Sequence, residues 1–136
     1  MTNIVLCDLP NTLFDSRHRS TEAMLCITDI KSDKINKDAL SLVQDLQKLN
    51  YSFIYTHYCL SRLADIVEDM LLKYVPTAKF YTNFATQQVY NNQTLKEHVV
   101  KMLVQSGHQI CYAIDNDIKM TAFYHNNNIP NLRVPL

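Results

Sequence analysis

The chain has 136 residues, of which 47% are hydrophobic and 19% are charged, and its formal net charge is zero. This composition is typical of one folded domain and excludes an intrinsically disordered chain. The balanced charge also argues against broad electrostatic binding to nucleic acid or to a membrane surface.

The cysteines and the apolar segments indicate where such a protein resides. The four cysteines lie far apart and form no Cys-x-x-Cys pair, which argues against a disulfide framework or a zinc site. We recognise no signal peptide and no apolar stretch near the roughly 18 residues that a membrane span needs. We therefore expect a cytoplasmic protein with reduced thiols and no membrane contact. Its richness in Asn, Lys, Ile and Tyr suggests an AT-rich genome, such as that of a virus.

The predicted elements alternate between strands and helices along the chain. The predicted strands cover residues 4–7, 52–55, 78–81, 109–114 and 132–134. The predicted helices cover residues 39–49, 60–74, 94–103 and 120–124. A Thr-x-x-Glu capping box at Thr94 marks the expected start of the third helix. Residues 13–38 lack sustained periodicity, so we expect a loop insertion or a small cap there, with at most a short helix or hairpin.

This alternation predicts an α/β fold of three layers, in which helices cover both faces of a mostly parallel sheet of five strands. We expect residues 1–136 to form a single Rossmann-like domain. Ligands of such folds bind beyond the carboxyl ends of the strands. Asp8, Thr56 and Asp115 each stand where a predicted strand ends. The sequence therefore predicts a polar site at the edge where these strand ends meet.

Four short motifs resemble those of the haloacid dehalogenase-like (HAD) superfamily, and the resemblance covers nearly the whole chain. The segment Asp8-Leu9-Pro10-Asn11-Thr12 stands in the place of the family's D-x-D-x-T/V motif. Thr56 matches the Thr or Ser that ends the next strand, Lys96 matches the later helical Lys, and Asp115-Asn116-Asp117 matches the acidic fourth motif. Tyr81-Thr82-Asn83 and its spacing to Lys96 are most similar to small phage-type polynucleotide 3′-phosphatase and nucleotidase domains.

The resemblance implies a HAD-like fold with a minimal cap or none, and a magnesium-dependent phosphohydrolase that acts on a nucleotide or nucleic-acid phosphate. The family's carboxylate nucleophile attacks phosphorus to give an aspartyl-phosphate, and this role falls to Asp8. The resemblance assigns contacts with the phosphoryl oxygens to Thr12, Thr56 and Lys96. It assigns the Mg²⁺ ligands to Asp8, the backbone carbonyl of Pro10 and Asp115. The implied partner is a phosphorylated small molecule, a nucleotide or a nucleic-acid end.

Pro10 is the main departure from the family pattern, because it replaces the aspartate that protonates the leaving oxygen and later activates water. Its carbonyl is retained for a metal, but general acid–base assistance, worth about 10²–10⁴-fold, is lost. His57 and Asp15 are the candidate substitutes for the missing acid or base. Asn11 replaces a glycine and is expected to keep a positive φ. His57-Tyr58 replaces a Gly-Arg pair, which removes a cationic phosphate contact.

Other interpretations of these residues stay open. Asp8 is also compatible with the start of a turn, and Asp117 with the N-cap of the following helix. Lys96 is compatible with a solvated position, with Lys79 and Lys101 as its rivals. At the level of function, the alternative is a catalytically degenerate member that binds a phosphorylated ligand or a protein partner. Chemistry on carbon–phosphorus or carbon–halogen bonds would need more cap residues than 13–38 supply.

Overall fold

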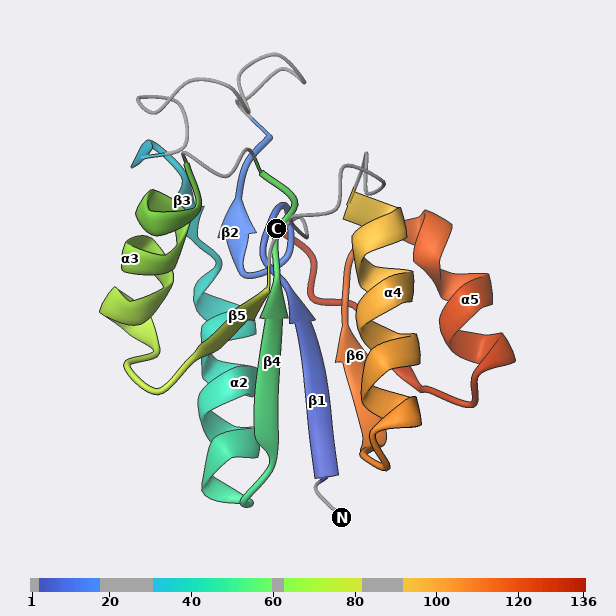
Figure 1. The fold of residues 1–136 in the computed structure, drawn as a ribbon. Coiled ribbons are helices and arrows are strands. Elements are labelled where there is room, and N and C mark those ends of the chain that lie inside the picture. The colour runs from blue at the N-terminus through green and yellow to red at the C-terminus, as the bar shows by residue number, and fades with distance from the viewer. Residues whose placement is uncertain (1–2, 18–30, 60–62, 82–91) are drawn as a thin grey trace.

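Five parallel strands form the central sheet of the computed structural model, which describes residues 3–17, 31–59, 63–81 and 92–136 (Figure 1). The strands follow the order β5-β4-β1-β6-β7, and every neighbouring pair is parallel. Their bounds are β1 Asn3–Asp8, β4 Ser52–Thr56, β5 Lys79–Tyr81, β6 Gln109–Ile114 and β7 Asn131–Leu132. The prediction of a Rossmann-like α/β fold around a five-stranded sheet is confirmed.

Helices cover both faces of this sheet, as the alternation of elements predicts. α2 (Lys37–Lys48) and α3 (Ala64–Tyr74) lie on one side, and α4 (Asn92–Gln105) and α5 (Thr121–Asn126) lie on the other (Figure 1). A short 3₁₀ helix, η3 (Ile118–Met120), leads directly into α5. The sheet therefore separates two hydrophobic layers, one beneath each pair of helices.

The side chains of the central strands alternate between these two layers, because successive residues of a strand point to opposite faces. In β1, Val5 and Cys7 belong to the core under α2 and α3, whereas Ile4 and Leu6 belong to the core under α4 and α5. This alternation explains why β1 reads as an unbroken apolar run. It also decides which face a polar residue at the end of each strand points to.

Residues 13–38 contain a hairpin in the part that the structure describes. β2 (Phe14–Asp15) pairs antiparallel with β3 (Lys34–Ile35), in agreement with the expected short hairpin. The remainder of that segment, residues 18–30, lies outside the described residues, and so does Thr82-Asn83. The expectation of a minimal cap or none therefore stays a prediction.

Two predicted boundaries are wrong by a few residues. α4 already includes Asn92, so Thr94 is a helical residue and not the N-cap. The last strand covers Asn131–Leu132 and ends two residues before the predicted limit of 134, because only these residues pair with β6.

Asparagines adopt positive φ at several turns. The φ angles are 56° for Asn11, 68° for Asn50 and 57° for Asn128, and Gly107 has a φ of 85°. The expectation that Asn11 keeps the conformation of the family glycine is therefore confirmed, since Asn adopts the left-handed region more readily than most residues. Among the described helices, none is long and apolar enough to cross a membrane.

Candidate active site

Two predicted site residues, Asp8 and Thr56, meet at the carboxyl ends of neighbouring strands and share one face of the sheet. Asp8 has the same parity in β1 as Ile4 and Leu6, so its carboxylate continues the row that faces α4. Thr56 follows Ile54 in the same way, and the two strands pair with Asp8 opposite Thr56. The Thr56 hydroxyl donates a hydrogen bond of 3.1 Å to Asp8 Oδ1. Strand alternation and register therefore place this carboxylate beside this hydroxyl.

Lys96 enters the site from α4 and is buried, with 2% of its side chain exposed. Its ammonium nitrogen lies 2.8 Å from Asp115 Oδ2 and 3.3 Å from Asp8 Oδ2. The interpretation of Lys96 as a solvated residue is therefore wrong, whereas its rivals Lys79 and Lys101 are both exposed. One ammonium joins the acidic residues at the ends of β1 and β6.

Asn92 is a site residue that the sequence analysis missed. Its side-chain nitrogen donates to both oxygens of Asp8, at 2.9 Å to Oδ1 and 3.2 Å to Oδ2. Its side-chain oxygen accepts a 2.9 Å hydrogen bond from the backbone N–H of Tyr58. Because Asn92 precedes Lys96 by four residues, both side chains lie on one face of α4. The four-residue spacing could have marked Asn92 as a neighbour of Lys96, although it does not show that Asn92 contacts Asp8.

Asp115 is held by several donors at the end of β6. The hydroxyl of Tyr124 donates a 2.8 Å hydrogen bond to Asp115 Oδ2, and the backbone N–H of Asp117 donates to Oδ1 at 2.9 Å. Burial and the neighbouring Asp115 carboxylate raise the pKa of Tyr124 well above its ordinary value, so the hydroxyl stays a donor. Tyr124 is a second residue that the sequence analysis missed.

Asp117 caps η3 and also lies near the Lys96 ammonium. Its side chain caps η3 by accepting a 3.0 Å hydrogen bond from the backbone N–H of Lys119, as the N-cap interpretation predicted. Its other oxygen lies 3.6 Å from the Lys96 ammonium. The residue is one-third exposed, so it contributes less to the buried cluster than Asp8 or Asp115.

Burial dominates the electrostatics of the cluster. It raises the pKa of the Asp8 carboxyl to about 7, against the opposing effect of the Lys96 ammonium and with added repulsion from Asp115. Burial alone would lower the pKa of Lys96, but Asp8 and Asp115 outweigh it, so that pKa lies above its ordinary value. With both aspartates ionised, one ammonium faces two buried carboxylates, and one negative charge stays uncompensated.

That excess negative charge is what a hard divalent cation would compensate. Mg²⁺ in proteins is bound by one or two carboxylates with further oxygen ligands, and it usually keeps several waters. Asp8, Asp115 and the Pro10 carbonyl fit such a set in chemical type. Among the described residues, no group of three His, Cys, Asp or Glu side chains could hold a metal ion. The magnesium site therefore stays a prediction that rests on two carboxylates and a carbonyl.

The loops that carry these acids are bound to each other through Thr12 and Asn116. The Thr12 hydroxyl accepts a 3.0 Å hydrogen bond from the backbone N–H of Asn116, and the Asn116 side chain donates to the Asn11 carbonyl at 2.8 Å. Thr12 is fully buried in this contact. Its position supports a structural role, and its contact with phosphate stays a prediction.

The same loops hold the segment after β7. The side-chain amide of Asn116 pairs with the backbone of Val134, accepting from its N–H and donating to its carbonyl, both at 2.7 Å. Asn36 donates to the same carbonyl at 3.1 Å and to the Thr12 carbonyl at 3.0 Å. Neither Asn36 nor Val134 was expected to support the site.

The two candidate substitutes for the missing aspartate have other partners. Both oxygens of Asp15 bind the Arg17 guanidinium, at 3.0 Å to Nε and 2.8 Å to Nη2. His57 is buried, and its Nδ1 lies 2.8 Å from the Tyr58 carbonyl. Since a carbonyl only accepts, Nδ1 must carry the proton. No hydrogen bond within the described part of the chain joins either side chain to Asp8, and their acid–base roles stay predictions.

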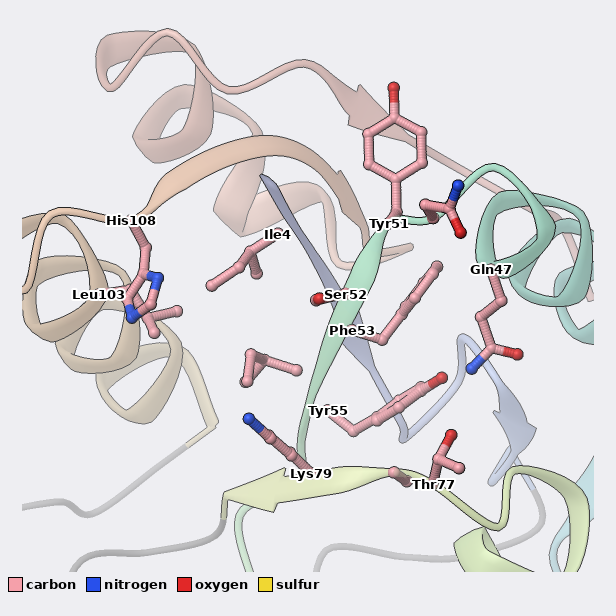
Figure 2. A pocket seen from close by; sticks show the side chains of 13 residues that line it. Ile4, Gln47, Tyr51, Ser52, Phe53, Tyr55, Thr77, Lys79, Leu103 and His108 are labelled. Atoms are coloured by element: carbon pink, nitrogen blue, oxygen red, sulfur yellow. The ribbon is translucent and has the colours of Figure 1, made fainter. Parts of the chain in front are cut away.

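A separate cavity of about 570 Å³ lies along β4, away from this cluster (Figure 2). It is lined by residues from the start of β4, such as Ser52 and Phe53, and by Leu103 and His108 from the region where α4 ends. Lys79, the rival of Lys96, lines it, but Asp8, Thr56, Lys96 and Asp115 do not. Ligands of parallel α/β sheets bind at the opposite edge, so we place the candidate active site at Asp8.

Comparisons with known proteins support the architecture. No protein-family model and no curated protein matches the chain. Among solved structures, a chain of "Structure of Pnkp1/Rnl/Hen1 complex" is similar with a TM-score of 0.78 and 16% identity, over 99% of this chain and 46% of that one. A chain of "Structure of the Pnkp1/Rnl/Hen1 RNA repair complex" gives a TM-score of 0.80 and 16% identity, over 98% of this chain and 42% of that one. The chain thus spans less than half the length of these neighbours, with which it shares the fold.

Proposed function

We propose that the chain is a HAD-like, magnesium-dependent phosphohydrolase that acts on a nucleotide or nucleic-acid phosphate. The observation that carries the proposal is the buried cluster in which the Lys96 ammonium contacts the carboxylates of Asp8 and Asp115. The family resemblance assigns these same three residues to one site. The RNA repair complex named for a structural neighbour is consistent with a nucleic-acid substrate.

In this proposal Asp8 is the nucleophile. One of its oxygens attacks phosphorus, the ester P–O bond breaks, and the leaving oxygen takes up a proton from solvent water, because Pro10 supplies none. Water then cleaves the aspartyl-phosphate, which releases inorganic phosphate and restores the carboxylate. Thr56 and Asn92 orient the carboxylate through their hydrogen bonds to Oδ1, at 3.1 Å and 2.9 Å. Mg²⁺ bound by Asp8, Asp115 and the Pro10 carbonyl would neutralise charge on the phosphoryl oxygens.

Pro10 supports the second candidate function, a catalytically degenerate protein that binds a phosphorylated ligand or a protein partner. Proline supplies no proton to the leaving oxygen, and neither Asp15 nor His57 is hydrogen-bonded to Asp8. Loss of acid–base assistance lowers the rate by about 10²–10⁴-fold without weakening the binding of a phosphate. The two candidates therefore differ in turnover and share the site.

Turnover of a generic phosphate ester separates them. With magnesium, the wild-type chain should hydrolyse the ester slowly, and Asp8→Asn should abolish the activity. Asp45→Asn is the matched control, because Asp45 is exposed on α2. Absence of wild-type turnover at high enzyme concentration would overturn the phosphohydrolase.

Pro10→Asp tests how much of the family chemistry is intact. If the site lacks only its acid, this substitution should raise the rate by about 10²-fold or more. An unchanged rate in a variant that folds normally would favour the binding role.

A further inference from the structure

A second cavity lies at the loops that follow β1 and β6, and two arginines line it. It has a volume of about 480 Å³, and its walls are Asn11, Arg17, Asn116, Arg133, Pro135 and Leu136. Asn11 directly follows Pro10, and Asn116 stands between Asp115 and Asp117. The cavity therefore shares its walls with both loops that carry the proposed magnesium ligands.

Sheet register accounts for the position of Arg133. β7 is parallel to β6, with Leu132 opposite Ile114, and the backbone N–H of Asp115 donates to the Leu132 carbonyl at 3.1 Å. Arg133 is thus the next residue beyond β7 at the edge where Asp115 follows β6. It is exposed and forms no ion pair with any described residue. Its guanidinium is available to an anion in the cavity.

Arg17 lines the same cavity from beside the hairpin and pairs with Asp15, with 63% of its own side chain exposed. Asp15 binds its Nε and Nη2 at 3.0 Å and 2.8 Å, which leaves the third guanidinium nitrogen for another acceptor. Among the described side chains that line the cavity, two are cationic and none carries a carboxylate. Arginine is the side chain best suited to bind phosphate, because its planar donors match the phosphate oxygens.

We infer that this cavity binds a second phosphate group of the substrate while the first occupies the site at Asp8. The inference rests on the proposed function and narrows its substrate class to molecules with two neighbouring phosphate groups. A nucleoside bisphosphate and an oligonucleotide with a terminal phosphate both have this chemistry. Arg17 and Arg133 would then supply the cationic contact that the chain lost where His57-Tyr58 replaces Gly-Arg.

Equilibrium binding to the Asp8→Asn chain tests this inference without consuming the ligand. Calorimetry with a nucleoside 3′,5′-bisphosphate should give an affinity about tenfold higher than with either monophosphate, as expected for a charge-assisted hydrogen bond. A terminally phosphorylated dinucleotide is the second probe. A gain with either probe supports the second-phosphate site and identifies its source as a monoester or a phosphodiester. If neither probe binds with higher affinity than the monophosphates, the inference is overturned.

Substitution of the arginines in the same background decides whether the cavity is responsible. Arg133→Ala should remove the preference for the second phosphate, and Arg133→Lys should retain part of it. Lys101→Ala, which removes an exposed charge on α4, is the matched control and should retain all of it. A preference that survives Arg133→Ala and Arg17→Ala would contradict the inference.

The outcomes are separable from those of the proposed function. The wild-type chain could hydrolyse simple esters while the binding assay shows no higher affinity for ligands with a second phosphate. That result would support the phosphohydrolase and contradict the second-phosphate site. If the arginine-dependent preference is found without turnover, the second-phosphate site stands and the site at Asp8 is one for binding.

Discussion

The two faces of the sheet have the same construction and very different chemistry. Under α2 and α3 the strands contribute side chains such as Val5, Cys7 and Tyr55 to an apolar core. Under α4 and α5 the apolar core ends in buried polar residues, among them Asp8, Thr56, Lys96 and Asp115. One face stabilises the fold through burial alone, whereas the other also holds charges in a setting that burial makes costly. Variants of the two faces should therefore differ in sign, in magnitude and in their dependence on pH.

Loss of the ammonium should have the largest effect on the polar face. Lys96→Met leaves the two buried carboxylates without their cationic partner, which typically costs about 3–5 kcal/mol of unfolding free energy. Urea unfolding at neutral pH measures this loss. Lys101→Met on the exposed side of the same helix is the control and should change the free energy of unfolding by less than about 0.5 kcal/mol. Equal effects of the two substitutions would contradict the buried cluster.

Truncation on the apolar face should cost somewhat less and should leave chemistry untouched. Leu71→Ala in α3 removes a fully buried side chain and should lower the free energy of unfolding by about 3 kcal/mol. Binding of phosphate probes to the folded fraction should be unchanged, because Leu71 belongs to the core under α2 and α3. A changed affinity would show that the two faces are coupled.

Asp8→Asn should raise the free energy of unfolding of the metal-free protein, whereas the two preceding substitutions lower it. Burial raises the pKa of Asp8 to about 7, so the native state binds this proton more tightly than the unfolded chain does. The resulting stabilisation is complete below the unfolded pKa of about 4 and is lost as the pH rises through about 7. The Asp8→Asn variant does not lose stability in this way, because its amide does not ionise. Lys96 keeps its 2.8 Å contact with Asp115.

Chemical unfolding from pH 4 to pH 8, with a chelator present, tests this sign. The variant should match the wild type near pH 4 and exceed it by on the order of 2 kcal/mol at pH 8. Added magnesium should stabilise the wild type and not the variant. A stability difference that is constant across this pH range would refute the raised pKa of Asp8.

The smallest effect is expected at Asn92, which orients the Asp8 carboxylate without carrying charge. Asn92→Ala removes hydrogen bonds to both oxygens of Asp8 and should cost about 1–2 kcal/mol of unfolding free energy. If the phosphohydrolase is active, kcat should fall with little change in KM, because Asn92 acts through Asp8. Gln105→Ala, at the exposed end of α4, is the control. An equal loss in KM would instead place Asn92 in contact with the substrate.

The sequence predicted best what depends on neighbouring residues in the chain. Asp8 and Asp115 could be located because each directly follows an apolar strand, and strand parity then sets the face. Asn11 could be assigned a positive φ because that preference is a property of its own backbone. Such features require no knowledge of how the helices pack.

The contacts that the sequence did not reveal join distant segments. Asn92 and Tyr124 contact Asp8 and Asp115 only because α4 and α5 pack over the same face, a tertiary fact that periodicity does not contain. The capping-box pattern at Thr94 was wrong because its residues lie inside a helix that tertiary packing extends to Asn92. The pairing of Asn116 with Val134 was beyond prediction, since it follows from the position of a strand only two residues long.

The two hydrogen bonds between the Asn116 side chain and the Val134 backbone also determine when the site can form during synthesis. A chain leaves the ribosome from its N-terminus, and its early segments can fold before the later ones emerge. β1 and its Asp8 exist from the start, but the loop around Asp115 acquires its two bonds to the backbone of residue 134 only when that residue appears. Until then the acids at the ends of β1 and β6 lack part of their support. A nascent chain can therefore pair β1 with β4 and β6 before the segment that completes the site has been made.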